Sequence, residues 1–194
     1  MLGAAEAVAA NGYAATSVAD IIGRAKVSRA TFYQLFDDKA DCFLAACEMV
    51  SGVLADVMSH ELARMELESG ATPIDKLDRL LRAYLDAIAA NPALARVFLV
   101  EVYAAGEAAI RRRRDAMERF VDLITAAYGD TPGLLGTALE QRFAAEVLVG
   151  AVSSMVTNAV ALGEVHRLSE LREPLIHLAA QLTAPPGTIP NEDL

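Results

Sequence analysis

The sequence predicts an all-α protein, and three observations lead to that prediction. Paired runs of alternating β-branched and aromatic residues, bounded by Asn-Gly or Asp-Gly turns, do not occur. Alanine, the residue with the highest helix propensity, is abundant nearly everywhere. Most glycines and prolines lie between segments whose apolar residues recur at helical spacing. We therefore expect the 194 residues to form helices joined by short connections.

The element boundaries follow from capping and turn residues. Asn11-Gly12 is expected to end the first helix, because glycine adopts the left-handed conformation that closes helices. Thr16, Ser17 and Ser28 are N-cap types, and an aspartate at 37 or 38 suits the start of the fourth helix. The predicted helices cover residues 2–10, 17–24, 29–36, 37–67, 73–90, 93–104, 107–128, 135–162 and 168–182, with a disordered tail at 185–194.

Composition narrows the class of protein. Hydrophobic residues make up 54% of the chain and charged residues 22%, which excludes intrinsic disorder. The longest charge-free stretch that could cross a membrane, residues 147–163, is shorter than the ~20 residues of a span and carries four polar side chains, so it is expected to be a buried helix. Two cysteines cannot form a disulfide framework, and no secretory signal pattern is found. These features predict a cytoplasmic protein.

Charge is distributed unevenly along the chain. The net charge of −9 by itself argues against a nucleic-acid partner. Residues 21–36, however, contain no acidic side chain, and Arg24, Lys26 and Arg29 stand together there. The sequence thus combines an acidic protein with one local basic patch.

The basic patch lies in a stretch with helix-turn-helix spacing. A short helix, a tight turn at Ala25-Lys26-Val27 and a second short helix opening at Ser28 give the geometry that places the second helix in a DNA major groove. The interior of this unit is expected to contain Val18, Ile21, Ile22, Val27, Phe32 and Phe36.

Three runs in this stretch carry a family resemblance: TSVADII at 16–22, AKVSRATFYQLF at 25–36 and DKADCF at 38–43. Together they resemble the DNA-binding domain of the TetR family of transcriptional regulators, over residues 1–47. The remainder, residues 48–184, is similar only in length and helical character. The resemblance implies a homodimer that binds a palindromic operator, usually as a repressor, and releases it when a small molecule enters the C-terminal domain. One departure is Lys26, which stands where the family often has glycine.

The resemblance and the chemistry of the side chains together give candidate DNA contacts. Arginine suits guanine, glutamine suits adenine, and an alanine methyl can touch a thymine methyl, whereas hydroxyls and lysine suit phosphates. A plainer interpretation also stands, in which the hydroxyl residues are helix caps only and Tyr33 is a packing residue. The candidates for bases are Arg29, Ala30, Thr31 and Gln34, and those for the backbone and turn are Thr16, Ser17, Lys26, Ser28, Tyr33 and Lys39.

Apolar positions in the C-terminal half can enclose a ligand pocket. Helices of this type form small-molecule sites lined by apolar side chains and a few polar groups, although an ordinary filled core would have the same pattern. The candidate pocket residues are Tyr84, Phe98, Val102, Tyr103, Met117, Phe120 and Asn158.

The last two helices are expected to hold a dimer together. Leucines recur there at spacings of three and four, and two small residues on the preceding helix permit close approach of another helix. Packing within one subunit is the alternative. The candidate interface residues are Gly150, Ser154, Leu171, Leu175, Leu178 and Leu182.

Other features suggest no further chemistry. The basic run Arg111–Arg114 is expected to be a solvated helix face, with Asp115 and Glu118 placed for pairing. Cys42 and Cys47 are interpreted as buried thiols, and no metal-ligand pair, catalytic motif or cofactor-binding loop is found. The leading hypothesis is a ligand-responsive regulator; the alternative is a helical scaffold that no longer binds DNA.

Overall fold

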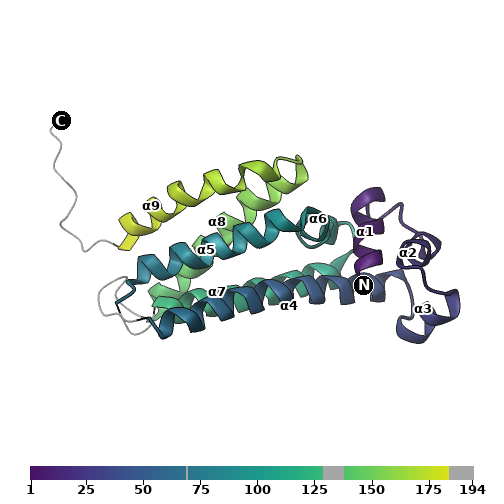
Figure 1. Ribbon diagram of the computed structural model, residues 1–194, viewed down its shortest axis with the longest axis horizontal. Coiled ribbons are helices and arrows are strands. Elements are labelled where there is room, and N and C mark those ends of the chain that lie inside the picture. Colours follow the sequence, from purple (N-terminus) through teal and green to yellow (C-terminus); the bar gives the residue numbers. More distant parts are fainter. Residues whose placement is uncertain (69, 129–137, 184–194) are drawn as a thin grey trace.

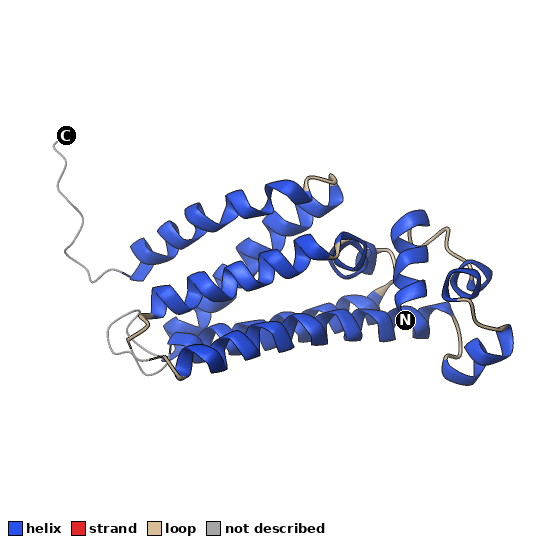
Figure 2. Cartoon of the chain, viewed as in Figure 1, coloured by secondary structure: helices blue, strands red, loops and turns tan. Residues whose placement is uncertain are grey.

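Helices account for all the regular structure in the computed structural model, which describes residues 1–68, 70–128 and 138–183 (Figures 1 and 2). No strand occurs among these residues, which confirms the all-α prediction. The expected tail at 185–194 lies outside the described residues. The elements are α1 (Leu2–Asn11), α2 (Val18–Ala25), α3 (Arg29–Leu35), α4 (Lys39–Glu66), α5 (Pro73–Ala90), α6 (Pro92–Leu99), the 3-10 helix η1 (Glu101–Tyr103), α7 (Glu107–Tyr128), α8 (Ala138–Ala161), the 3-10 helix η2 (Val165–Leu171) and α9 (Arg172–Thr183).

The first three helices form a small unit at one end of an elongated molecule (Figure 1). Its core is built around Ile21 and Phe32, which are both buried. Helix α1 approaches α2 closely at Gly3, where an added Cβ would lie 2.6 Å from Ala25 Cα. Val27, expected in this core, is instead 40% exposed because it lies in the turn between α2 and α3.

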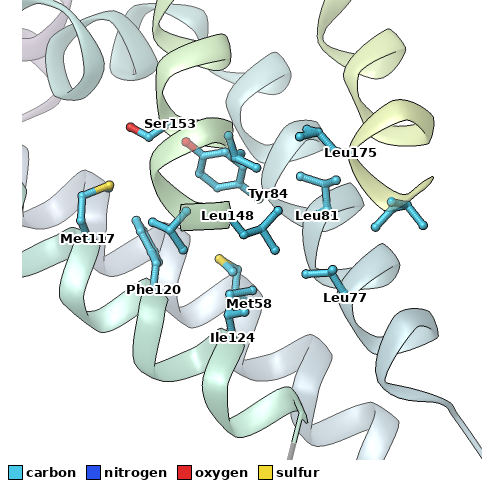
Figure 3. Close-up of a pocket in the computed structure, with 13 residues that line it drawn as sticks. Met58, Leu77, Leu81, Tyr84, Met117, Phe120, Ile124, Leu148, Ser153 and Leu175 are labelled. Carbon is cyan, nitrogen blue, oxygen red and sulfur yellow. The ribbon is translucent and has the colours of Figure 1, made fainter. Parts of the chain in front are cut away.

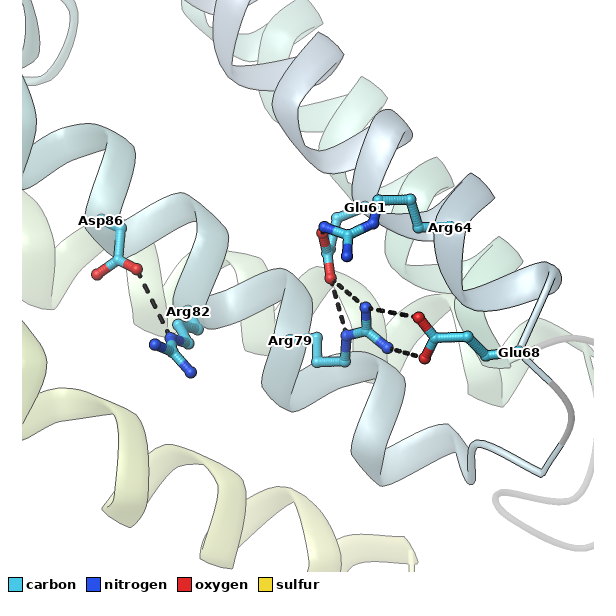
Figure 4. Close-up of polar contacts among 6 residues, drawn as sticks. All are labelled: Glu61, Arg64, Glu68, Arg79, Arg82 and Asp86. Atoms are coloured by element: carbon cyan, nitrogen blue, oxygen red, sulfur yellow. Dashed lines mark hydrogen bonds and ion pairs between the residues drawn. The ribbon is translucent and has the colours of Figure 1, made fainter.

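Helix α4 connects this unit to the rest of the molecule. It runs along the bundle beside α5 and α7, with which it packs (Figure 1). At its far end, Arg79 of α5 donates hydrogen bonds to Glu61 over 2.8 Å and to Glu68 over 2.5 Å (Figure 4). Through Glu61, the guanidinium therefore ties α5 to the last turns of α4. Through Glu68, it ties α5 to the residues that directly follow α4.

Two predicted α-helices are divided in the structure. The one expected at 93–104 becomes α6 followed by η1, and the one expected at 168–182 becomes η2 followed by α9. Pro174 explains the second division, since a proline is tolerated only in the first turn of an α-helix. Apolar spacing does not distinguish an α-helix from a short 3-10 segment, so the spacing used for the prediction could not indicate either division.

Candidate functional site

Side-chain caps fix the starts of α2 and α3. The Ser17 backbone N–H and hydroxyl both donate to the Asp20 carboxylate, over 2.8 and 2.6 Å, and the Asp20 N–H donates back to the hydroxyl. These hydrogen bonds hold the pKa of Asp20 below its usual value. The Ser28 hydroxyl accepts from the Thr31 N–H over 3.0 Å. Each serine thus satisfies a free backbone N–H at a helix start.

The turn between the two helices passes through Lys26. This residue has φ 54° and ψ 42°, the left-handed conformation in which glycine is favoured. Its side chain is exposed, so the lysine accepts the backbone strain while its charge remains free to meet a phosphate. The usual turn is therefore kept despite the departure in sequence.

Helix α3 presents its candidate base-reading residues outward. Arg29, Ala30, Tyr33 and Gln34 are exposed, and Thr31 is half-buried. The Arg29 guanidinium lies 5.5 Å from the centre of the Tyr33 ring, which holds both side chains over one turn of the helix. The outward face predicted from the sequence is therefore present.

Two residues predicted to contact the DNA backbone make contacts within the protein. Thr16 is 2% exposed, and its hydroxyl donates to Gly12 O over 2.7 Å, so the prediction that this hydroxyl binds DNA is wrong. Its short side chain instead closes the turn after α1. Lys39 is half-buried, with Nζ donating to Tyr13 O over 2.9 Å and lying 4.3 Å from the centre of the Tyr13 ring. Lys39 therefore holds the turn after α1 against the start of α4. Its contact with a DNA phosphate stays a prediction.

An apolar cavity of about 50 Å³ lies inside the C-terminal bundle (Figure 3). Of the predicted pocket residues, Tyr84, Met117 and Phe120 line it. Phe98 and Val102 do not, because both are fully buried in packed core. The full lining is Met58, Leu77, Leu81, Tyr84, Met117, Phe120, Ile124, Leu148, Val149, Val152, Ser153, Leu175 and Ile176.

A wider and more polar hollow of about 720 Å³ adjoins this cavity, and we call it the vestibule. The two share Met117, Val149 and Ser153, so they meet at the wall between α7 and α8. The predicted pocket residues Tyr103 and Asn158 line the vestibule rather than the cavity. Its lining is Tyr103, Arg113, Arg114, Met117, Glu118, Val121, Arg142, Glu146, Val149, Gly150, Ser153, Ser154, Thr157 and Asn158.

Arg113 lies at this junction and was missed by the sequence analysis. It is only 7% exposed, and its guanidinium donates to Ser153 Oγ over 2.6 Å, to Tyr103 Oη over 3.2 Å and to Phe98 O over 3.3 Å. All these acceptors are neutral, and no carboxylate among the described residues pairs with it. Within the part of the chain that the structure describes, this buried positive charge is therefore met by neutral acceptors and by the faces of the Phe98 and Tyr103 rings, with no carboxylate counter-ion. An anionic ligand would supply the missing counter-charge.

Tyr84 provides a second polar group at the same place. Burial raises its pKa to about 12, so the hydroxyl stays protonated at neutral pH. That hydroxyl makes no hydrogen bond to any residue the structure describes. Tyr84 and Ser153 both line the cavity (Figure 3). The hydroxyl is therefore free to bond a polar atom of a ligand.

The basic run is only partly the solvated face that was expected. Arg114 pairs with Glu118 as predicted, over 3.2 Å. Arg111 pairs with Glu107, one turn before it, and not with the predicted Asp115, one turn after it. Cys42 and Cys47 are buried free thiols, in agreement with the sequence interpretation, and burial raises the pKa of Cys47 to about 12.

Some of the candidate interface residues are exposed, and others are buried or half-buried within the subunit. Gly150 and Ser154 are exposed and Leu178 is 48% exposed, whereas Leu171 is half-buried against the core. Leu175 is 4% exposed and lines the apolar cavity, so its assignment to a dimer seam is wrong. The side chain of Leu182 lies outside the described residues. Three large apolar residues of α8 that the prediction omitted, Phe143, Val147 and Met155, are exposed, and so is Leu162 directly after the helix.

The outward face of α8 is unusually apolar for a soluble helix. Residues Gln141–Ala161 and Lys39–Glu66 are both long and apolar enough to cross a membrane by length and composition alone. The second stretch belongs to the core, with 44% of its most apolar window buried, but the first has only 17% buried within the subunit. The expectation that residues 147–163 form a buried helix is therefore wrong, since Val147, Met155 and Leu162 are all exposed. An exposed apolar surface of this extent is typical of one that packs on another protein.

Comparisons with known proteins identify both halves of the chain. Residues 1–46 match the family model described as "Bacterial regulatory proteins, tetR family", and residues 49–181 match "YsiA-like protein, C-terminal region". A search of curated proteins finds no match.

Several solved structures share the fold. The fatty acid degradation regulator FadR from Bacillus halodurans has a TM-score of 0.76 and 22% identity, with 91% of this chain and 94% of that chain covered. FadR from Bacillus subtilis, solved with stearoyl-CoA, has a TM-score of 0.72, 22% identity and the same coverage of 91% and 94%. A regulatory protein from Rhodococcus RHA1 has a TM-score of 0.70 and 19% identity, covering 94% of each chain. The two family models account for nearly the whole chain, and the protein therefore belongs to the TetR family of bacterial transcriptional regulators.

Proposed function

We propose that this protein is a cytoplasmic repressor whose effector is an amphiphile with a long apolar chain and an anionic group. As a TetR-family member it binds operator DNA as a dimer and responds to a small molecule. The observation that carries the proposal is the buried Arg113 guanidinium, which has neutral partners only among the described residues. The matched family is one of bacterial regulatory proteins, so the scaffold hypothesis is set aside.

The arrangement of polar and apolar surface supports an amphiphile. The cavity is lined almost entirely by hydrocarbon and thioether groups, which suit an alkyl chain. Three arginines line the vestibule, but Arg114 pairs with Glu118 and Arg142 pairs with Asp122 and Glu146. Arg113 is therefore the arginine left to meet a phosphate or carboxylate. We place the anionic group against Arg113 and a neighbouring carbonyl oxygen against the Tyr84 hydroxyl.

The cavity must widen before it can hold such a chain. Its volume of about 50 Å³ is well below the ~300 Å³ at which ligand pockets begin. Met58 and Met117 line the cavity, and unbranched thioether side chains change rotamer at low cost. Stearoyl-CoA, the ligand in the similar FadR structure from Bacillus subtilis, combines an acyl chain with phosphates and is the kind of molecule proposed here.

The test compares Arg113→Met with Arg111→Met in the full-length dimer. Methionine keeps much of the side-chain length and removes a buried unpaired charge, so the first variant should fold at least as stably as the wild type. Arg111 is an exposed member of the same run, outside the vestibule, and serves as the matched control. Palmitoyl-CoA is the probe, and binding is measured by calorimetry.

We expect Arg113→Met to bind palmitoyl-CoA at least tenfold more weakly, in keeping with a lost charge-assisted contact of about 1.5–3 kcal/mol. It should consequently remain on operator DNA at probe concentrations that release the wild type. Arg111→Met should behave as the wild type. Equal affinity of all three proteins for palmitoyl-CoA, or no binding by the wild type, would refute the proposed effector class.

A further inference from the structure

The 3-10 helix η1 directs three successive side chains into three different parts of the molecule. A 3-10 helix has 3.0 residues per turn, so consecutive side chains point roughly 120° apart. Val102, in the middle, is fully buried in the core. Glu101 and Tyr103, on either side of it, point away from one another and make contacts in different domains. A single short turn is thus anchored in the core and touches two sites.

Glu101 contacts the DNA-binding unit. Its carboxylate accepts a hydrogen bond from the Tyr13 N–H over 2.9 Å and pairs with Arg96 over 3.2 Å, and the residue is 7% exposed. Tyr13 lies in the turn that joins α1 to α2, and its carbonyl accepts from Lys39 at the start of α4. Figure 1 shows α1 between α6 and α2, so this contact lies at the boundary between the two parts of the protein.

Tyr103 contacts the effector site. Its hydroxyl accepts from Arg113 Nε over 3.2 Å, and Arg113 also donates to Phe98 O, near the end of α6, over 3.3 Å. The guanidinium therefore holds the α6–η1 segment at two points. It is the same guanidinium that lacks a carboxylate partner among the described residues.

We propose that Glu101 is the positioning residue through which effector binding changes the orientation of the DNA-binding helices. An anion in the vestibule competes with Phe98 O and Tyr103 for Arg113, because charged acceptors bind a guanidinium more strongly than neutral ones. Once released, the α6–η1 segment moves, and Glu101 moves with it away from the Tyr13 N–H. The coupling has the differential contacts that a ligand needs in order to shift an equilibrium.

This inference rests on the proposed effector site, and the first experiment separates the two. Glu101→Ala is compared with Glu107→Ala, an exposed glutamate just beyond η1 that contacts neither the vestibule nor α1. Both full-length dimers are titrated with palmitoyl-CoA and, separately, with an operator selected from random DNA by the wild type. Circular dichroism confirms that each variant keeps its helical content.

We expect Glu101→Ala to bind palmitoyl-CoA within twofold of the wild type, because Glu101 does not touch the vestibule. Its operator affinity without the probe should fall. Adding palmitoyl-CoA should lower this affinity further, but by less than a third of the fold-decrease that palmitoyl-CoA causes in the wild type. Glu107→Ala should keep the full response. If Glu101→Ala kept the wild-type response, Glu101 would not be the coupling residue, even though the effector site itself was correct.

The second experiment needs no effector, so it remains decisive if palmitoyl-CoA fails to bind. Tyr103→Phe, Glu101→Gln and the double variant are compared in operator affinity without any probe. If η1 transmits the contact, the effects of the two substitutions are not independent. The fold-loss of operator affinity in the double variant should then be smaller than the product of the two single fold-losses, by about threefold or more. Amide exchange at Tyr13 should accelerate in Tyr103→Phe, as in Glu101→Gln. Independent effects on affinity, with unchanged exchange at Tyr13 in Tyr103→Phe, would overturn the inference.

Discussion

Four adjacent arginines illustrate how completely position determines the role of a residue. Arg111 and Arg114 pair with glutamates on their own helix, and Arg112 pairs with Glu48 across to α4. Arg113, with the same chemistry, lies on the buried side of α7. A signal for this was present in the sequence, since Ala109, Arg113, Ala116 and Phe120 recur at spacings of four, three and four.

The residues of α3 give a prediction at the same scale. If Arg29 and Gln34 read bases, Arg29→Ala and Gln34→Ala should each lose ~1 to 3 kcal/mol on the selected operator and much less on random DNA. Both side chains are exposed, so stability should be unaffected. Fluorescence anisotropy on the two DNAs measures the difference. Equal losses on both would reclassify the residue as a phosphate contact.

At the scale of elements, one glycine decides how closely α1 approaches α2. The two helices pack so tightly at Gly3 that any side chain there would overlap the Ala25 backbone. Gly23, in the interior of α2, has open space around its Cα. The same residue type therefore serves close packing in one helix and only weakens the other.

Alanine substitutions at the two positions should have opposite effects. Gly3→Ala should destabilise the DNA-binding unit by ~1 to 3 kcal/mol, because overpacking shifts the backbone. Gly23→Ala should be neutral or stabilising by ~0.5 to 1 kcal/mol, because it removes freedom from the unfolded chain and adds no clash. Urea unfolding followed by circular dichroism gives both values. A stabilised Gly3→Ala would mean that α1 packs elsewhere.

For the whole molecule, the apolar face of α8 and the exposed Leu178 of α9 give the expected surface for dimerisation. Phe143 is 64% exposed and Val147 is 50% exposed, an arrangement that is costly for an isolated subunit. Two DNA-binding units joined in this way raise operator affinity through effective concentration. The acidic net charge of −9 makes this linkage important, since we expect each short basic patch to bind DNA only weakly alone.

Two neighbouring leucines distinguish the dimer face from the effector cavity. Leu178→Glu should give folded monomers by light scattering, because like charges would meet in the seam, and operator affinity should fall far more than affinity for random DNA. Leu175→Glu should instead lower the stability of the subunit by several kcal/mol, on the order of the cost of burying an unpaired charge. A dimeric Leu178→Glu variant would place the seam elsewhere.

The sequence by itself determined the helical class, most helix boundaries, the helix-turn-helix and its outward face. These depend on local causes: serine caps, turn residues and the spacing of apolar side chains within a single helix. The left-handed conformation of Lys26 did not follow from these local causes, and only the family resemblance, in which glycine often stands there, drew attention to that position.

Only the tertiary structure decided which side of each C-terminal helix faces the cavity, the core or a partner. Leu175 and Leu178 belong to the same leucine pattern, yet one lines the cavity and the other is exposed. The contacts of Arg113 with α6, η1 and α8, and of Glu101 with Tyr13, join residues far apart in the chain. Periodicity gives the direction of a side chain around its own helix axis, but what lies there depends on how the helices pack together.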